Sequence, residues 1–265
     1  MNKLTFYISF ILVTIMLVIS CKKEIYYEGE KGTLIGFIVD EDFDPLEGVT
    51  VTLEGTDIEA ISDTNGKYIF SDLKTDIYTF TYSKKEYGTY KIYGYQFLAG
   101  KIPTYHKYNV RLYQTSNLGV NDVTYDTLRK GFIHFYGKVI YDQIQDFDTV
   151  YEYSYENNIY FYFPVRYFIS DKPEVSGNNY RVTGSLHNSG LSEKHIDSSS
   201  FLGHIFTNEL KSFKSHQKLY ITFDTYKYNT DHYYLDINTG CNVFVNLSGK
   251  ESKPIQFTVP AFPEY

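Results

Sequence analysis

Cys21 is the side chain whose type and position point most directly to chemistry, because a thiol can accept an acyl group. It follows a short positive start at Met1-Asn2-Lys3, an apolar run from Leu4 to Ile19, and the small residue Ser20. This order of segments is typical of a secretory signal peptide. The sequence therefore predicts a signal peptide over residues 1–20 and a mature chain that begins at Cys21.

The residues around the expected cleavage site, Val18-Ile19-Ser20-Cys21, resemble the lipobox of bacterial lipoproteins. The resemblance implies that the Cys21 thiol carries a diacylglyceryl group and that the new amino terminus is also acylated. Several acyl chains hold a protein firmly to a bilayer, because each buried methylene contributes about 0.8 kcal/mol. An uncleaved transmembrane anchor is the alternative, and the apolar run lies at the short limit for a span of roughly 20 residues.

The residue after the cysteine predicts where the anchored chain goes. In the lipoprotein family an aspartate at this position retains the protein in the inner membrane, and here the residue is Lys22. Lys22-Lys23-Glu24 also resembles the charged tags that send some lipoproteins to the cell surface. We therefore expect a lipid-anchored protein of the cell outer membrane, with the periplasmic and the surface-exposed orientation both left open.

The other residues that could do chemistry do not form a known constellation. No two of the 7 histidines have the four-residue spacing of a helical zinc site. Asp40, Asp42 and Asp44 alternate and could chelate calcium, but the glycine and the distal glutamate of an EF-hand loop do not follow them. No Gly-x-Ser-x-Gly elbow occurs. We expect no metal, no cofactor, no catalytic residues and no enzymatic activity.

Composition predicts an all-β chain. The sequence contains 29 Tyr and 20 Phe but no Trp, and tyrosine and phenylalanine favour strands. The formal net charge of −7 gives no basic excess, so we expect no nucleic-acid partner.

Apolar and polar side chains alternate between Gly32 and Leu112, as in half-buried strands. The spaced positions in this region are Gly36, Val39, Asp40, Pro45, Leu46, Gly48, Val49, Val51, Gly55, Thr56, Asp63, Gly66, Tyr68, Phe70, Leu73 and Tyr78. Together they resemble the carboxypeptidase regulatory-like domain. The resemblance implies a transthyretin-like β-sandwich over residues 32–113, preceded by a lipidated tether over residues 21–31. Asp76 is a departure, because the family usually has glycine before the Tyr78 strand.

In metallocarboxypeptidases this sandwich lies beside a catalytic domain whose metal site uses a His-x-x-Glu pair. No histidine of this chain is followed by glutamate three residues later. The resemblance therefore implies the fold but not the peptidase activity.

Residues 114–123 are small and polar and predict a linker. Beyond it, short apolar stretches separated by turn residues predict strands over 132–141, 158–169, 180–186, 218–226, 242–247 and 255–259. Their regular spacing predicts a second β-sandwich over residues 124–265, which resembles an immunoglobulin-like or fibronectin-type-III module. Ser199–Phe213 is the nearest candidate for a short helix. With lipid on Cys21, Cys241 has no disulfide partner and is expected to be a small buried hydrophobe.

Aromatic rows are the candidates for ligand contact, because exposed rings stack on sugars or anchor protein partners. The candidate contact residues are Tyr93, Tyr95, Phe97, Tyr226, Tyr228, Tyr233 and Tyr234. Alternation predicts that Tyr93, Tyr95 and Phe97 share one strand face, with Tyr90 on the other. Cross-strand pairing within a sheet is the alternative role for every one of these rings.

These expectations lead to a lipid-anchored, non-enzymatic protein of the cell envelope that acts as a binding or adhesion module for a glycan or an envelope protein. The alternative is a structural accessory subunit that docks on an outer-membrane transporter or assembly. In both hypotheses the membrane is contacted through the lipid anchor.

Overall fold

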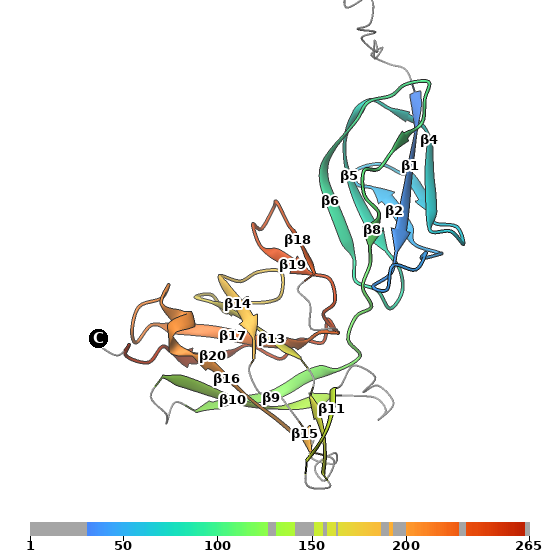
Figure 1. Ribbon diagram of the computed structural model, residues 1–265. Helices are drawn as coiled ribbons and strands as arrows, with labels where there is room; N and C mark the ends of the chain where they lie inside the picture. Colours follow the sequence, from blue (N-terminus) through green and yellow to red (C-terminus); the bar gives the residue numbers. More distant parts are fainter. Residues whose placement is uncertain are drawn as a thin grey trace, which may run out of the picture.

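The computed structural model describes residues 31–126, 131–140, 151–155, 158–162, 164–186, 191–192, 200–227 and 232–262 (Figure 1). The predicted signal peptide, Cys21, most of the tether and Tyr228 lie outside these residues. Over the described ranges the chain is all-β, as predicted, with several sheets and a short 3-10 helix, η3 (Thr207–Leu210). This part of the chain has no helix with the length and apolarity needed to cross a membrane.

The first module is built from two facing sheets of short antiparallel and parallel pairs. One sheet contains β4 (Lys67–Lys74), β1 (Lys31–Val39), β7 (Thr104–Tyr105) and β8 (Val110–Arg111). The other has the order β3 (Glu59–Ile61), β2 (Thr50–Leu53), β5 (Asp76–Ser83), β6 (Tyr90–Phe97). Alternation explains the arrangement, because Val51 and Leu53 of β2 and Phe80 and Tyr82 of β5 point to one shared core.

A glycine makes room for the largest ring of this core. Gly36 of β1 is paired directly with Tyr68 of β4, whose side chain is completely buried. A Cβ atom at Gly36 would lie 2.2 Å from the Cζ and Oη atoms of Tyr68. The side chain of Tyr68 therefore covers the β1 backbone, and only glycine fits beneath it.

Three polar side chains form a row of close polar contacts in the same core. The hydroxyl of Tyr68 lies 3.0 Å from the hydroxyl of Tyr82 and 3.0 Å from Nδ1 of His106. The His106 ring is packed among Phe80 and Tyr95, and its Nε2 is buried without a hydrogen-bond partner. Desolvation by burial lowers the pKa of His106 to about 4 and raises that of Tyr82 well above its usual value.

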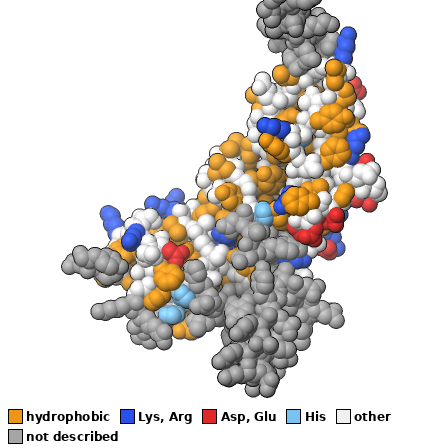
Figure 2. Space-filling view, in the orientation of Figure 1, with side chains coloured by type: hydrophobic (Ala, Val, Ile, Leu, Met, Phe, Trp, Pro, Cys, Tyr) orange, Lys and Arg blue, Asp and Glu red, His pale blue; other side chains and the backbone are white. Residues whose placement is uncertain are grey.

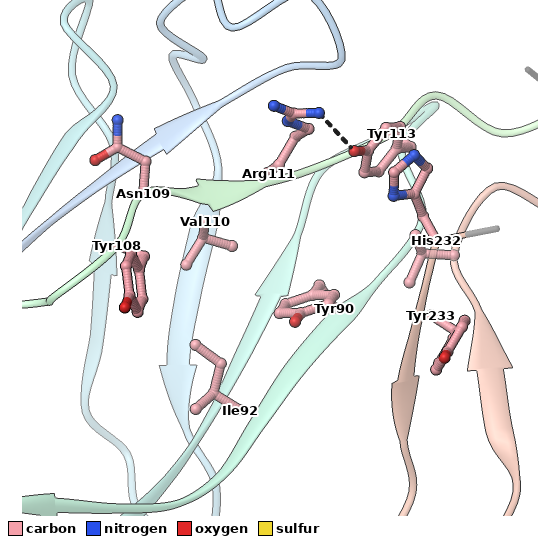
Figure 3. Close-up of a pocket in the computed structure, with 10 residues that line it drawn as sticks. Tyr90, Ile92, Tyr108, Asn109, Val110, Arg111, Tyr113, His232 and Tyr233 are labelled. Carbon is pink, nitrogen blue, oxygen red and sulfur yellow. Dashed lines mark hydrogen bonds between the residues drawn. The ribbon is translucent and has the colours of Figure 1, made fainter. Parts of the chain in front are cut away.

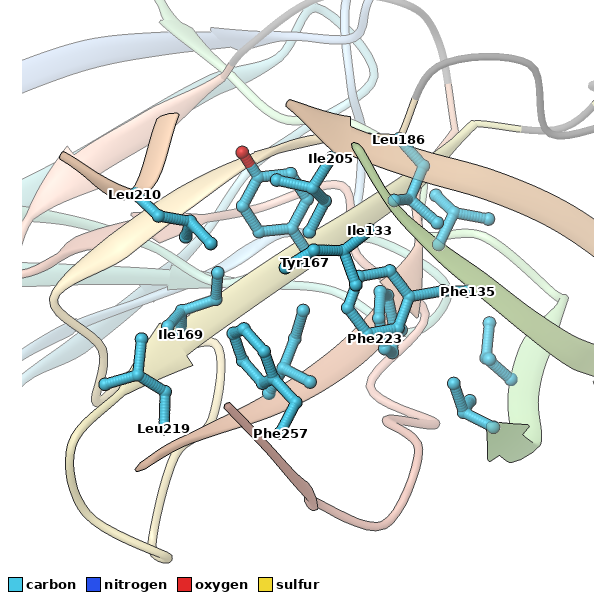
Figure 4. Packing of buried hydrophobic residues seen from close by; sticks show 14 of the residues in the cluster. Ile133, Phe135, Tyr167, Ile169, Leu186, Ile205, Leu210, Leu219, Phe223 and Phe257 are labelled. Atoms are coloured by element: carbon cyan, nitrogen blue, oxygen red, sulfur yellow. The ribbon is translucent and has the colours of Figure 1, made fainter. Parts of the chain in front are cut away.

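The second module also closes around one large core. One sheet has the order β14 (Val182–Ser185), β13 (Val165–Ser170), β17 (Lys218–Thr225), β20 (Ile255–Thr258). The other has the order β16 (Ser200–Phe206), β10 (Phe132–Ile140), β9 (Gly119–Asp126). Side chains from both sheets, including Phe135, Tyr167, Phe223 and Phe257, meet between them (Figure 4).

Two further strand groups complete the described chain. The first contains β11 (Tyr151–Tyr155), β12 (Asn158–Tyr162) and β15 (Leu191–Ser192). The second is the hairpin of β18 (Tyr233–Leu235) and β19 (Asn242–Phe244). Phe244 of this hairpin packs with Phe168 and Val175 on the outer face of β13, and the guanidinium of Arg166 lies 3.9 Å from the Phe244 ring centroid.

Some segments differ from the sequence prediction. The strand expected over 158–169 is divided into β12 and β13, and Pro164, which lacks an amide N–H, lies between them. Within the helix candidate Ser199–Phe213, the chain forms strand β16 and then the short 3-10 helix η3, because Ile205 enters the core while β16 pairs with β10. Asp76 does not have a positive φ; in this turn region the left-handed residue is Asp72, with φ 56°.

The segment predicted as a linker, residues 114–123, is tied to both modules. Gln114 forms a bridge with Tyr87 of the first module and accepts a hydrogen bond from Lys227 Nζ of the second. The hydroxyl of Ser116 lies 2.8 Å from that of Thr225. From Gly119 onward the chain is strand β9, since the buried side chains of Val120 and Val123 belong to the second core.

Asp224 and Cys241 are both buried in the second module. Asp224 accepts hydrogen bonds from the Ser248 hydroxyl and from the backbone N–H groups of Thr225 and Gly249. Burial nevertheless raises the pKa of this carboxyl to about 7. Cys241 is buried, as expected, and its thiol donates to the Tyr180 carbonyl oxygen at 3.4 Å.

We predict that Gly36→Ala lowers the free energy of unfolding by about 1–3 kcal/mol, because the added methyl group forces the Tyr68 ring to move within a filled core. Urea denaturation of the Cys21→Ser chain measures the change. An unaltered midpoint would show that Tyr68 does not cover Gly36 in solution.

We also predict a dependence of stability on pH that comes from His106. Between pH 4 and 6.5 the folded state binds fewer protons at His106 than the unfolded state does, so the free energy of unfolding falls as the pH falls through this window. After discounting for the solvent-exposed part of the ring, the expected loss is about 1–2 kcal/mol.

His106→Gln should remove this slope. Asp224 acts in the opposite direction, because its raised pKa makes the folded state bind more protons between pH 3.8 and 7. Since that contribution is common to both proteins, the difference between parent and variant isolates His106. Equal slopes in the two proteins would contradict the prediction.

Candidate ligand-binding site

A pocket of about 320 Å³ lies where the first module meets the β18–β19 hairpin. The first module contributes Tyr90 and Ile92 from β6 and the segment from Tyr108 to Tyr113 around β8. The hairpin region contributes His232, Tyr233 and Val245. In the space-filling view, hydrophobic side chains gather over the first module and where it meets the second (Figure 2).

The lining side chains divide by direction (Figure 3). Tyr108 and Val110 leave the chain on the side where Tyr90 and Ile92 lie, whereas Asn109 and Arg111 point to the opposite side. Arg111 donates a hydrogen bond to the Tyr113 hydroxyl at 3.1 Å, and its guanidinium lies 3.3 Å from the centroid of the Phe43 ring. The pocket thus has aromatic and aliphatic walls, and its one lining cation is directed to other protein groups.

Exposure shows which rings a ligand can reach. The Tyr108 side chain is 72% exposed and that of Tyr233 is 47% exposed. Tyr113 is buried, and its ring is stacked on His232 with 3.5 Å between centroids and 15° between planes. Tyr108 and Tyr233 are therefore the rings available for contact, while Tyr113 and His232 hold the two modules together.

The hairpin is fixed to β6 by more than one contact. The Tyr234 ring meets Tyr90 edge to face at 5.8 Å and lies 6.2 Å from Tyr93. The Tyr93 hydroxyl donates to Asp236 at 3.2 Å. At the base, a Cβ atom on Gly88 would lie 1.5 Å from the Val245 carbonyl oxygen, so the two backbones are in close contact.

Burial at this junction raises the pKa values of several phenols. Desolvation raises the pKa of Tyr90 and Tyr234, and it also raises that of Tyr93, where nearby Lys91 opposes the shift. The Asn238 N–H, the Tyr93 hydroxyl and other donors lower the pKa of Asp236. Neutral tyrosine hydroxyls can both donate and accept hydrogen bonds, which suits a ligand rich in hydroxyl groups.

A β-bulge separates the predicted row on β6. The register skips one residue between the Tyr78–Tyr95 and Phe80–Ile92 pairs, and Gly94 in the bulge has φ +67°. As a result Tyr95 and Phe97 join the core of the first module, and Tyr93 turns to the hairpin. The prediction that Tyr93, Tyr95 and Phe97 share a face is therefore wrong.

The other candidate contact residues are dispersed. Tyr233 lines the pocket and Tyr234 supports it. Tyr226 is buried in the second module, where its hydroxyl lies 2.9 Å from that of Ser185. Tyr228 lies outside the described residues. The structure thus brings Tyr93, Tyr233 and Tyr234 to one junction and places Phe97, Tyr95 and Tyr226 elsewhere.

Sequence reasoning missed Tyr108, Tyr113 and His232 as members of the site. No local pattern marks them, because they come from segments more than a hundred positions apart that meet only in the folded chain. Gly94 within the alternating stretch was the available signal for the bulge, since an isolated glycine in a strand indicates one.

Within the described ranges, no three His, Cys, Asp or Glu side chains are grouped to hold a metal ion. His134 and His204 are directly paired across β10 and β16, with ring centroids 6.0 Å apart and Phe132 beside both. Asp40, Asp42 and Asp44 lie in one turn, in which Asp40 Oδ1 accepts the N–H groups of Asp42 and Asp44.

Comparison with known proteins identifies part of the chain. Residues 33–112 match the carboxypeptidase regulatory-like domain, in agreement with the resemblance seen in the sequence. The first module is therefore a carboxypeptidase regulatory-like domain, and the match ends before the second module. No curated protein matches the chain.

Solved structures match the chain with low sequence identity and low TM-scores. A candidate carbohydrate binding protein from Bacteroides uniformis ATCC 8492 has 10% identity and a TM-score of 0.32, with 87% of this chain and 100% of that one covered. A DUF3823 family protein from the same organism has 12% identity and a TM-score of 0.30, with 87% and 100% covered.

A cohesin–X-dockerin complex from Acetivibrio cellulolyticus has 21% identity to this chain and a TM-score of 0.28. The alignment covers 32% of this chain and 59% of that one.

We predict that Gly88→Ala loosens the junction that forms the pocket. The added methyl group would meet a backbone carbonyl that cannot rotate away, so the hairpin must shift from the first module. Hydrogen exchange should show faster exchange of the β18 and β19 amides, with β1 and β13 unchanged. Unchanged protection of the hairpin would contradict the close contact between Gly88 and Val245.

Proposed function

We propose that this chain is a lipid-anchored, non-enzymatic binding module of the bacterial cell envelope, and that the pocket between its modules takes a neutral saccharide. The observation that carries the proposal is the pocket itself, with the exposed rings of Tyr108 and Tyr233 over apolar walls. Aromatic rings stack on the apolar faces of sugars, and hydroxyl groups at the rim satisfy sugar hydroxyls.

The lining favours a neutral ligand over a charged one. Arg111 is the one cation of the lining, and it is engaged by Tyr113 and Phe43. Neither aspartate nor glutamate lines the pocket. A ligand with a full charge would lose hydration on entry without gaining an opposite charge, which is unfavourable.

The remaining parts of the proposal come from the sequence. Cys21 carries the lipid in the outer membrane, and the second module has an immunoglobulin-like or fibronectin-type-III topology over residues 124–265. Labelling with radioactive palmitate, present in the parent and absent from Cys21→Ser, tests the anchor. Modification at any other residue would refute it.

A docking subunit of an outer-membrane assembly is the second candidate. It is supported by a row of apolar side chains on the outer face of the β4–β1–β7 sheet, where Ile69 and Tyr105 flank Ile35 in register. Ile69 is 44% exposed and Tyr105 is 61% exposed, so this row offers apolar surface to a protein partner.

Glycan arrays probed with the Cys21→Ser chain separate the two candidates. We predict that Tyr108→Ala and Tyr233→Ala each weaken binding of the captured glycan roughly tenfold, since each removes one stacking ring. Tyr136→Ala is the matched control, because this tyrosine is 41% exposed on β10, away from the pocket. Silence on the arrays, or equal loss in the control, would refute the saccharide proposal.

A further inference from the structure

The end of the first module at which the described chain begins carries exposed aliphatic side chains. Ile77 is 66% exposed and Ile102 is 74% exposed, and both lie at one tip of the first sandwich. We call the turn over residues 74–77 and the loop over residues 98–103, together with Lys31, the amino-terminal tip.

Backbone contacts show that these segments form one surface. Asp76 of β5 is paired with Phe97 of β6, and the Ala99 N–H donates to Thr75 Oγ1 at 2.9 Å. Lys31, the first residue of β1, is paired with Lys74. A Cβ atom on Gly32 would lie 2.9 Å from the Gly100 nitrogen, so the loop and the start of β1 are in contact.

The charges of the tip favour an anionic partner. Lys31, Lys74 and Lys101 are exposed there, and none of them forms an ion pair with a described residue. Asp72 and Asp76 are the exposed carboxylates of the same region, so lysines outnumber aspartates.

The length of chain before the tip points to the same partner. Residues 22–30 connect the predicted lipid-bearing cysteine to Lys31, and even when fully extended they span only about 30 Å. Figure 1 shows that the described chain starts at the end of the first module remote from the second module. The amino-terminal tip is therefore the part of the described protein that lies nearest the anchor.

We propose that the amino-terminal tip lies in the interface of an anionic bilayer, with Ile77 and Ile102 entering the headgroup region and the lysines contacting lipid phosphates. Apolar side chains flanked by basic ones are the composition that binds membrane interfaces. This inference rests on the lipid anchor of the proposed function. It adds a second contact, which orients the module on the membrane instead of leaving it to swing on its tether.

Because the chain contains no tryptophan, a single introduced tryptophan is the source of all tryptophan emission and reports on the environment of its own position. Full-length Ile77→Trp and Ile102→Trp, purified from membranes with their lipid, are incorporated into vesicles of phosphatidylethanolamine and phosphatidylglycerol. The emission of both variants should shift to the blue, and brominated lipid should quench it. Ile61→Trp is the matched control, because Ile61 is 63% exposed but lies on β3, outside the tip, and its emission should resemble that in water.

The outcomes distinguish the tip contact from the anchor. If the protein incorporates into the vesicles but the tryptophan stays unquenched in both tip variants, the tip contact is refuted and the lipid anchor is not. Protein that does not incorporate overturns the anchor and the tip contact with it. Quenching equal to that of the control also overturns the proposal, since it would show contact without orientation.

A charge test completes the design. Lys74→Glu with Lys101→Glu should reduce the quenching of the Ile102→Trp protein in anionic vesicles, whereas Lys85→Glu, at an exposed lysine of another loop, should not. Unchanged quenching after both tip substitutions would show that the lysines do not contact lipid phosphates. The glycan-binding measurement on the same proteins should be unaffected, because the pocket includes none of these residues.

Discussion

The contact between β6 and the β18–β19 hairpin is the constraint on which the candidate site depends. Each module has its own core, and the pocket lies where Tyr90, Ile92 and Val110 at the edge of the first core face the hairpin. The pocket exists because Tyr113 stacks on His232 and Tyr234 packs on Tyr90, which holds two separately folded surfaces together. A site of this kind is common where domains meet, because the junction supplies concavity that a convex sandwich lacks.

The fold of the first module was largely readable from the sequence. Strand alternation and spaced glycines identified β1, β2, β4 and β5, and the match over residues 33–112 agrees with the resemblance. Prediction failed where backbone geometry departed from a period of two. The extra residue at Gly94 reversed the direction of the side chains on either side of it, so a continuous row became two groups with different environments.

The candidate site was less predictable than the fold. Tyr93, Tyr233 and Tyr234 were identified because tyrosine clusters are visible in the sequence, and the structure brings them to one junction. Tyr108 and His232 also line the pocket, but they are brought together by contacts between distant segments, which no local sequence pattern predicts. Tyr226 shows the converse case, because this aromatic residue was a candidate for ligand contact but is buried and forms a part-buried hydrogen bond with Ser185.

The two modules are joined at two separate places, and this has a mechanical consequence. The covalent crossing at Gln114–Ser116 is pinned to Tyr87 on one side and to Lys227 and Thr225 on the other. The hairpin returns to the first module at a distinct point. Two attachments prevent rotation of the modules about a single bond, so a load on either module is shared between them. Torsion between the modules is therefore opposed both by the ring stacking at the hairpin and by the hydrogen bonds at the chain crossing.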